Sequence, residues 1–99
     1  MKPIAGILSG LLQDLGLAET VAGWRAVEEW PRLAGERIAR HSRAVAFHDG
    51  VLTVEVEGSA WMQELGFLRR ELVRKINREF EKEAVRDVRL VLAQGGRRR

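Results

Sequence analysis

The chain has 99 residues, of which 45% are hydrophobic and 31% charged, and it contains no cysteine. This length suits one domain with one core, and we expect no deep enzyme cleft walled by two lobes. The absence of cysteine excludes a disulfide framework and a thiolate metal site, and it is typical of a protein of the reducing cytoplasm. The net charge is +3, which equals the charge of the last three residues, Arg97, Arg98 and Arg99.

Residues 3–15 form the first predicted helix. Pro3 suits a first helical turn, where a missing N–H costs nothing, and Gly16 is a natural stop. Polar residues such as Ser9 and Gln13 interrupt the apolar run at helical spacing, so the pattern favours an amphipathic helix over a signal peptide. No apolar run approaches the roughly 20 residues that a membrane span needs. The apolar stripe consists of Ile4, Ile7, Leu8, Leu11, Leu12 and Leu15.

A second helix is predicted from residues 18–20 to about residue 30. Val21, Trp24 and Val27 lie three apart on one face of it, which predicts that this face packs on the core. Pro31 disfavours helical geometry at Trp30, so we expect a boundary or kink there and a short further turn that ends near residue 35. The pattern of residues 36–42 fits either another helical turn or the entry to a strand.

Two strands and a tight turn follow. Residues 43–48 read as the first strand, and residues 51–57 alternate apolar and polar side chains as the second. Between them, Asp49-Gly50 supplies the positive φ angles that a hairpin turn requires. Val88, Leu90 and Leu92 alternate again and predict a third strand.

A long helix over residues 60–81, with Ser59 as its cap, connects the second strand to the third. If this helix crosses over within one sheet, the two strands that it joins run parallel. We therefore predict an α+β fold in residues 1–93, with the order α-α-β-β-α-β, a small three-stranded mixed sheet and helices packed on one face. Residues 94–99 are predicted to be a flexible basic tail. The apolar stripe of the long helix consists of Trp61, Leu65, Leu68, Leu72 and Ile76.

No pattern in the sequence predicts catalysis. His41 and His48 are seven residues apart, and a regular strand points such positions to opposite faces, so we expect no shared metal site. Ser42 follows His41 directly, but neighbours in sequence do not make a hydrogen-bonded nucleophile and base. The glycines show no phosphate-binding loop after a strand. We expect no enzyme activity, cofactor, metal or small-molecule substrate.

The long helix carries a basic stripe opposite its apolar face. Phe67, Arg70, Arg74 and Arg78 lie there at helical spacing. Arginine binds phosphate strongly and an exposed phenylalanine stacks on a base, so the stripe fits a DNA-binding or acidic-partner surface. An ordinary solvated face, with Glu71 weakening the field and Phe67 packed under the first helix, fits the same pattern. The arginines of residues 97–99 add a flexible arm suited to phosphate.

The chain has three tryptophans, which are frequent anchors of protein interfaces. Trp24 and Trp61 lie on apolar faces and are predicted to be buried or half-buried. Trp30 and Trp61 are also candidate anchors for a partner protein, and a core position for either is the alternative.

Several short patterns recur in a fixed order between residues 21 and 92. In this order and spacing the chain resembles the DciA family of bacterial proteins, most strongly from residue 50 to residue 77. The matching patterns are Trp30, Gly35, Ile38-Ala39 and His41-Ser42, then Gly50-x-Leu52-x-Val54-x-Val56, Ser59-Ala60-Trp61-Met62-Gln63-Glu64-Leu65, Lys75-Ile76-Asn77 and Val85-x-x-Val88.

The resemblance implies a KH-like domain, in agreement with the predicted element order. It also implies a role in chromosome replication, in which the protein binds the replicative helicase DnaB and assists its loading on single-stranded or forked DNA. DciA-type proteins act without the ATPase machinery of DnaC-type loaders. Many members carry a long basic extension, which here is reduced to residues 94–99, and the chain lacks the Gly-x-x-Gly loop with which KH domains hold nucleic-acid backbone.

The leading hypothesis is a non-catalytic helicase-loading adaptor of the cytoplasm, associated with the nucleoid and not with a membrane. Phe67, Arg70, Arg74, Arg78 and the arginines of residues 97–99 would contact DNA, and Trp30 or Trp61 would contact the helicase. The alternative hypothesis is a KH-like RNA-binding or ribosome-associated module.

Overall fold

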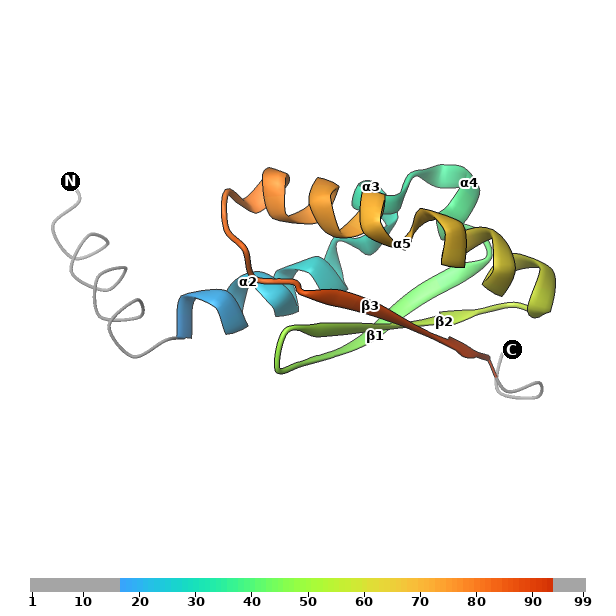
Figure 1. Cartoon of the computed structure of the whole chain (residues 1–99), viewed down its shortest axis with the longest axis horizontal. Coiled ribbons are helices and arrows are strands. Elements are labelled where there is room, and N and C mark those ends of the chain that lie inside the picture. The colour runs from blue at the N-terminus through green and yellow to red at the C-terminus, as the bar shows by residue number, and fades with distance from the viewer. Residues whose placement is uncertain (1–16, 94–99) are drawn as a thin grey trace, which may run out of the picture.

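The computed structural model describes residues 17–93 (Figure 1). The helix predicted at residues 3–15 and the tail with Arg97, Arg98 and Arg99 lie outside the described residues. The elements are, in chain order, α2 (Leu17–Glu28), α3 (Trp30–Ala34), α4 (Glu36–Ala39), β1 (Ser42–His48), β2 (Val51–Val56), α5 (Ser59–Phe80) and β3 (Asp87–Leu92).

The three strands form one mixed sheet in the order β1-β2-β3. β1 and β2 are antiparallel and joined by a hairpin, whereas β2 and β3 are parallel and joined through α5. In the hairpin turn, Asp49 has a φ of 54° and Gly50 a φ of 82°, which are the positive angles that Asp-Gly was expected to supply. Figure 1 shows α3, α4 and α5 on the same side of the sheet. The predicted α+β layout is therefore confirmed.

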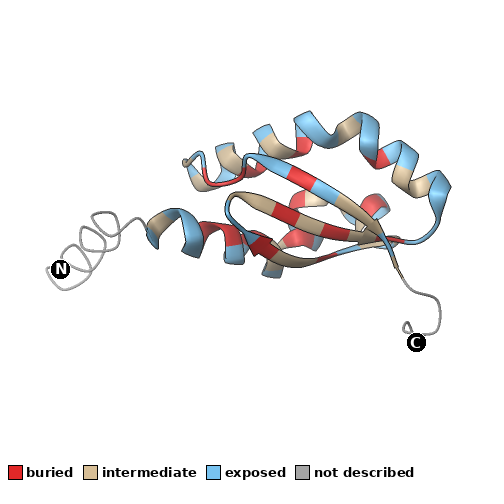
Figure 2. Cartoon of the chain, turned by 60° about the horizontal axis from the view of Figure 1, so that its bottom comes forward, coloured by how far each residue is buried: buried red, intermediate tan, exposed pale blue. Residues whose placement is uncertain are grey.

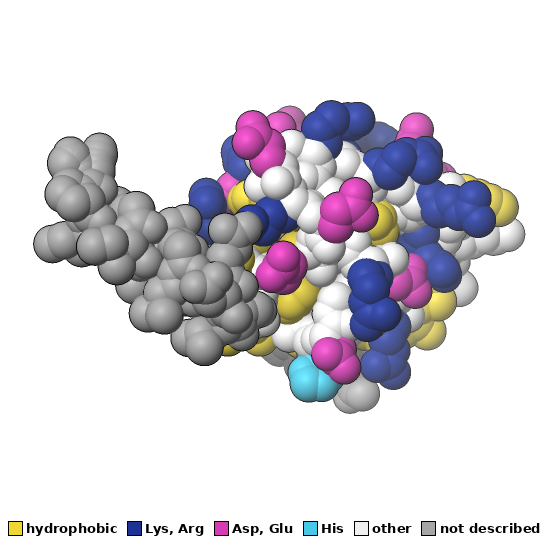
Figure 3. Space-filling model, turned by 60° about the vertical axis from the view of Figure 1, so that its left-hand side comes forward, with side chains coloured by type: hydrophobic (Ala, Val, Ile, Leu, Met, Phe, Trp, Pro, Cys, Tyr) yellow, Lys and Arg dark blue, Asp and Glu magenta, His cyan; other side chains and the backbone are white. Residues whose placement is uncertain are grey.

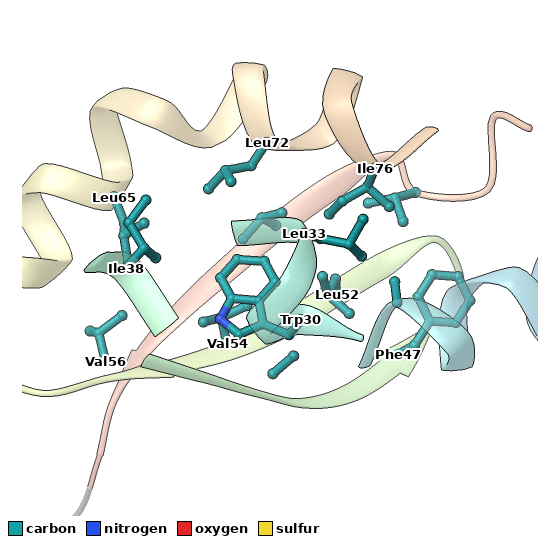
Figure 4. Packing of buried hydrophobic residues seen from close by; sticks show 14 residues of the cluster. Trp30, Leu33, Ile38, Phe47, Leu52, Val54, Val56, Leu65, Leu72 and Ile76 are labelled. Atoms are coloured by element: carbon teal, nitrogen blue, oxygen red, sulfur yellow. The ribbon is translucent and has the colours of Figure 1, made fainter. Parts of the chain in front are cut away.

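The core lies between α5 and the inner face of the sheet (Figure 4). Every second residue of β2 points inward, and every third or fourth residue of α5 meets it, as the two periodicities require. Each of these side chains is almost completely excluded from water, and full burial of one such aliphatic side chain is worth about 1.5–3 kcal/mol. They are Leu52, Val54 and Val56 from β2, with Leu65, Leu72 and Ile76 from α5.

Trp30 lies at the centre of this core beside Leu33 (Figure 4). Its side chain is 1% exposed, and its indole Nε1 donates a hydrogen bond to Ser42 Oγ at 3.0 Å. The Ser42 hydroxyl in turn donates to the carbonyl oxygen of Ile38 at 2.7 Å. The predicted role of Trp30 as a partner anchor is wrong for this structure, because the buried indole offers no surface to another molecule.

The predicted second helix corresponds to α2, which ends at Glu28. The expected boundary near Pro31 and the short further turn that ends near residue 35 are confirmed by α3. Pro31 sits in the first turn of α3, directly after the end of α2. Gly35 separates α3 from α4. Its φ of 94° is a backbone angle that residues other than glycine rarely adopt. Residues 36–39, whose state the sequence left open, form the helical turn α4.

The inner face of α2 is not the face that the sequence predicted. Ala22, Gly23 and Ala26 are its buried residues, whereas Val21 and Trp24 are exposed. Figure 2 shows that α2 is buried along one side only. The ring of Phe47 lies against Gly23 so closely that a Cβ added there would meet ring atoms at 2.3 Å. Small side chains allow this approach. The large residues Leu17, Val21 and Trp24 are exposed, whereas Val27 of the predicted face does pack against the core.

The start of α5 also differs from the prediction. α5 begins at Ser59 and its N-cap is Gly58, with a φ of 101° and no capping hydrogen bond from a side chain. Ser59 is therefore the first helical residue and not the cap.

A matched pair of glycine substitutions tests this packing. Gly23→Ala is expected to destabilise the fold by about 1–3 kcal/mol, because the new methyl group displaces the Phe47 ring. Gly66→Ala, in α5 with nothing within 4 Å of the added Cβ, is expected to stabilise it by up to about 1 kcal/mol through helix propensity. Urea denaturation of the two variants measures both values, and equal shifts would contradict the close approach of α2 and β1.

Candidate nucleic-acid and partner surfaces

The outer face of α5 is basic and fully open to solvent. Arg70, Arg74 and Arg78 are all exposed, and Phe67 is 80% exposed, so its ring is not packed under another element. Successive arginines are four residues apart, which places them about 6 Å from one another along the helix axis. In Figure 3, basic side chains gather over the upper and right-hand parts of the face, with acidic ones between them. The predicted stripe thus exists as a surface.

This stripe borders a groove between α5 and the segment that leads into β3. One hollow of about 680 Å³ is lined by Val73, Arg74 and Asn77 together with residues 78–86 in part. A second hollow shares Val73, Arg74 and Arg86 with the first, so the two form one continuous groove. Its lining has six basic and three acidic side chains, which are Arg69, Arg70, Arg74, Arg78, Lys82 and Arg86, and Glu81, Glu83 and Asp87.

Hydrogen bonds hold the far wall of this groove to the rest of the fold. The side-chain amide of Asn77 donates to the carbonyl oxygen of Val85 at 2.8 Å and accepts from the Val85 N–H at 2.9 Å. Arg86 lies over Gly50, and its guanidinium donates to the carbonyl oxygen of Asp49. The backbone N–H of Arg86 donates to the carbonyl oxygen of Gly50 at 2.7 Å. The groove therefore has two rigid walls.

Sequence reasoning missed Arg86 and Lys82 as members of this surface. Neither residue lies on the helix whose periodicity revealed the arginine stripe, and only the return of the chain along α5 brings them beside it. Asn77 belongs to one of the patterns that indicated the family. Its two hydrogen bonds to the Val85 backbone depend on the folded loop and were not predicted.

Six arginines of residues 17–93 pair with a carboxylate, whereas those of the stripe, Arg86 and Arg89 do not. Among residues 17–93, Arg70, Arg74 and Arg78 make no ion pair and no side-chain hydrogen bond, whereas Arg69 pairs with Asp87 at 3.5 Å. An unpaired exposed guanidinium keeps its full charge available to a phosphate or carboxylate. The stripe is thus the part of the described surface best suited to bind an anion.

Trp61 lies away from the groove, in a cluster near the start of α5. The His41 ring stacks on its indole with centroids 4.5 Å apart and planes 14° from parallel, and the Arg37 guanidinium carbon lies 5.4 Å from the ring centroid. Glu57 approaches His41 Nδ1 at 3.1 Å, and Glu64 pairs with Arg37 at 3.0 Å. The indole is half-buried, as predicted, and leaves part of its surface open.

Ion pairs join the helices on the opposite side of α5 from the groove. Glu29, which follows α2, pairs with Arg25 at 2.8 Å and also with Arg32. Arg32 extends to Glu79 of α5 at 3.0 Å. The hydrogen bonds from Arg32 and then from Arg25 lower the pKa of the Glu29 carboxyl below its ordinary value. These arginines are already occupied by carboxylates.

Among residues 17–93, no group of three or more histidine, cysteine, aspartate or glutamate side chains is arranged to hold a metal ion. None of the described helices combines the length and the hydropathy that a membrane span requires.

The fold and surface define a small α+β domain with a basic groove along its longest helix. A family model described as "Dna[CI] antecedent, DciA" matches residues 3–90. The chain belongs to the DciA family. Membership supports a role related to DNA replication, because the family is associated with loading of the replicative helicase.

Curated relatives of the chain include mycobacterial proteins with the designation UPF0232 protein. One from Mycobacterium bovis is 29% identical over 89 residues, which cover 90% of this chain and 48% of the relative. One from Mycolicibacterium smegmatis is 34% identical over 74 residues, which cover 71% of this chain and 38% of the relative. The chain thus spans about half the length or less of these relatives.

The Glu29 ion pairs predict a pH dependence of stability. Because folding lowers the pKa of Glu29 below its ordinary value of 4.5, its contribution is complete above that pH and is lost as the pH falls through the folded pKa. Glu29→Gln should therefore be less stable than the parent at pH 7, and the difference should shrink below about pH 4.5. Urea denaturation at pH 3 to 7 measures it. Glu28→Gln, which removes a neighbouring carboxylate without an ion pair in the described structure, is the control, and a gap that widens in acid would contradict the assignment.

Proposed function

We propose that the chain is a non-catalytic adaptor in bacterial DNA replication, which binds the replicative helicase DnaB and assists its loading on DNA. Membership of the DciA family supports the helicase partner. The observation that carries the DNA-binding part is the row of unpaired arginines beside a rigid basic groove. The proposal includes only weak binding of DNA, without choice of sequence.

Phosphate contacts are the main feature of the proposed DNA site. Arg70, Arg74 and Arg78 repeat at about 6 Å, a distance comparable to the spacing of successive phosphates in an extended single strand. Lys82 and Arg86 present further cations from the other wall of the groove. Contacts of this kind position a strand but read no bases, so the binding is independent of sequence.

Phe67 extends the same surface toward the start of α5. An exposed aromatic ring beside a basic groove offers a face on which an unpaired base stacks, an interaction worth about 1–3 kcal/mol per base. A base inside a duplex is already stacked, so this contact favours single-stranded or forked DNA. We include Arg97, Arg98 and Arg99 as an additional basic arm that contacts phosphate.

The acidic lining of the groove keeps this binding weak. Glu81, Glu83 and Asp87 lower the positive potential, and Asp87 occupies Arg69. An adaptor that delivers a helicase to DNA must also release the strand, and weak contacts suit that task. Because the attraction that remains is between arginines and phosphates, the binding is expected to fall as the salt concentration rises.

Trp61 is the proposed anchor for the helicase. Its ring is held in one orientation by His41 and Arg37, and each of these is itself oriented by a carboxylate. A partly exposed, preorganised tryptophan loses little conformational entropy on binding, which is typical of interface hot spots. Arg37 beside it is paired with Glu64, so this surface attracts DNA less than the groove does.

The two proposed surfaces lie on different sides of α5. Trp61 stands in the first turn on the side of α4, whereas Arg74 and Arg78 stand more than about three turns later on the side of β3. A helicase bound to the first therefore leaves the second open to DNA. This separation is what an adaptor between a protein and a nucleic acid requires.

Charge removal tests the DNA site. The triple change Arg70→Gln, Arg74→Gln and Arg78→Gln should weaken binding of a single-stranded oligonucleotide about tenfold or more and reduce the slope of log affinity against log salt by about 2. Fluorescence anisotropy at several salt concentrations measures both. The affinity for an RNA oligonucleotide of the same sequence, measured in the same way, tests the RNA-binding hypothesis.

The matched control is Arg40→Gln, Arg43→Gln and Arg89→Gln, which removes the same charge from exposed positions outside the groove. Equal losses in the two triple variants would show that net charge alone acts, and the groove assignment would then be withdrawn. Tighter binding of RNA than of DNA would favour the RNA-binding module over the replication adaptor.

A double comparison tests the helicase anchor. Trp61→Ala should weaken capture of purified DnaB about tenfold or more, since central tryptophans commonly contribute about 2 kcal/mol or more, and should leave DNA affinity unchanged. Phe67→Ala should weaken DNA binding and leave the capture of DnaB unchanged. Biolayer interferometry with each ligand measures these affinities, and absence of DnaB binding by the parent protein at micromolar concentration would refute the adaptor.

A further inference from the structure

α2 presents its largest apolar side chains away from the body of the protein. Leu17, Val21 and Trp24 follow one another at intervals of four and three residues, which places them in one stripe on the helix. They are 43%, 46% and 46% exposed. In the described part of the chain, only Phe67 and Leu92 are other large apolar residues of comparable exposure.

The side of α2 that faces the body carries small buried residues, with Val27 partly buried against the core beside them. Ala22, Gly23 and Ala26 are buried there, and the Phe47 ring occupies the space that a larger side chain at Gly23 would need. A surface helix normally turns its large apolar residues toward the core and its polar residues outward. The reverse arrangement in α2 is typical of a helix that lies between two layers, one of which covers the outer stripe.

The sequence directly before α2 has the composition of such a layer. Residues 3–15, which lie outside the described residues, carry six leucine and isoleucine residues at helical spacing. As a helix, this segment would be about 20 Å long and α2 is about 18 Å long, so their lengths match. Gly16 stands between them and can adopt the backbone angles of a sharp reversal.

We propose that residues 3–15 fold back at Gly16 and dock as a helix on the Leu17–Val21–Trp24 stripe of the same molecule. The two segments then form an antiparallel helical hairpin, in which the last residues of the first segment join Gly16 in a connection of about two to five residues. Pairing about Gly16 places Leu11 opposite Val21 and Leu8 opposite Trp24, so large aliphatic side chains meet the exposed stripe. The outer layer of the fold is thus supplied by the chain itself.

Size and proximity favour this occupant over a second copy of the chain. A stable interface between two proteins buries about 800 Å² on each partner, which three half-exposed side chains on one helix do not provide. A segment tethered by one glycine instead meets the stripe at an effective concentration in the millimolar range or above. The docked segment covers Trp24 and leaves the Trp61 cluster and the α5 groove open.

A distance measurement tests the hairpin in the full chain. Because the sequence has no cysteine, Lys2→Cys and Glu28→Cys provide the only two attachment points for spin labels. In the docked arrangement these positions are close, within about 20 Å including the label arms, since packed helices lie about 8–10 Å apart. One uninterrupted helix would instead separate them by about 39 Å. Double electron–electron resonance distinguishes the two.

Substitutions on each side of the contact sharpen the result. Leu8→Gln with Leu11→Gln should abolish the short distance, and so should Val21→Gln with Trp24→Gln, while Ser9→Ala with Gln13→Ala on the polar face should preserve it. The folded body survives the α2 change because neither side chain is buried in it. A long distance in the parent protein overturns the proposal. A short distance that disappears when labelled chains are diluted with unlabelled ones also overturns it, because a second copy is then the occupant.

Discussion

The contact between α5 and the inner face of β2 determines most of what this protein can present to other molecules. Leu65, Leu72 and Ile76 interlock with the alternating aliphatic residues of β2, and this contact fixes the rotation of α5 about its own axis. Once that rotation is fixed, the residues half a turn away must face solvent. The exposure of Phe67 and the arginine stripe is therefore a consequence of core packing, and the groove follows from the return of the chain along the same helix.

Two groups of arginines in the described structure differ in their partners. Arg25, Arg32 and Arg37 form ion pairs that connect helices, and a phosphate could use them only by displacing a carboxylate. Arg74 and Arg78 have no such partner, so binding an anion there breaks no existing contact. The same residue type thus serves the fold on one side of α5 and remains available for binding on the other, which is the basis of the proposed division between helicase and DNA surfaces.

α2 shows how a close approach can reverse an expected pattern. The spacing of its large residues correctly predicted that those side chains lie together on one face. The error concerned Val21 and Trp24, since the Phe47 ring lies too close to Gly23 for a larger residue there, whereas Val27 does pack against the core. An amphipathic period shows that a face is to be covered, but the covering partner is a separate question.

The sequence by itself determined the local elements: the alternation of β2, the Asp-Gly turn, the boundary at Pro31 and the apolar stripe of α5 each follow from the geometry of a few neighbouring residues. The family was also recognisable from patterns spread along the chain. Only the tertiary structure decided that Trp30 is a core residue, that Trp24 points outward and that Arg86 joins the groove. These positions depend on which distant elements come into contact, and a local period carries no information about residues that are far away in the chain.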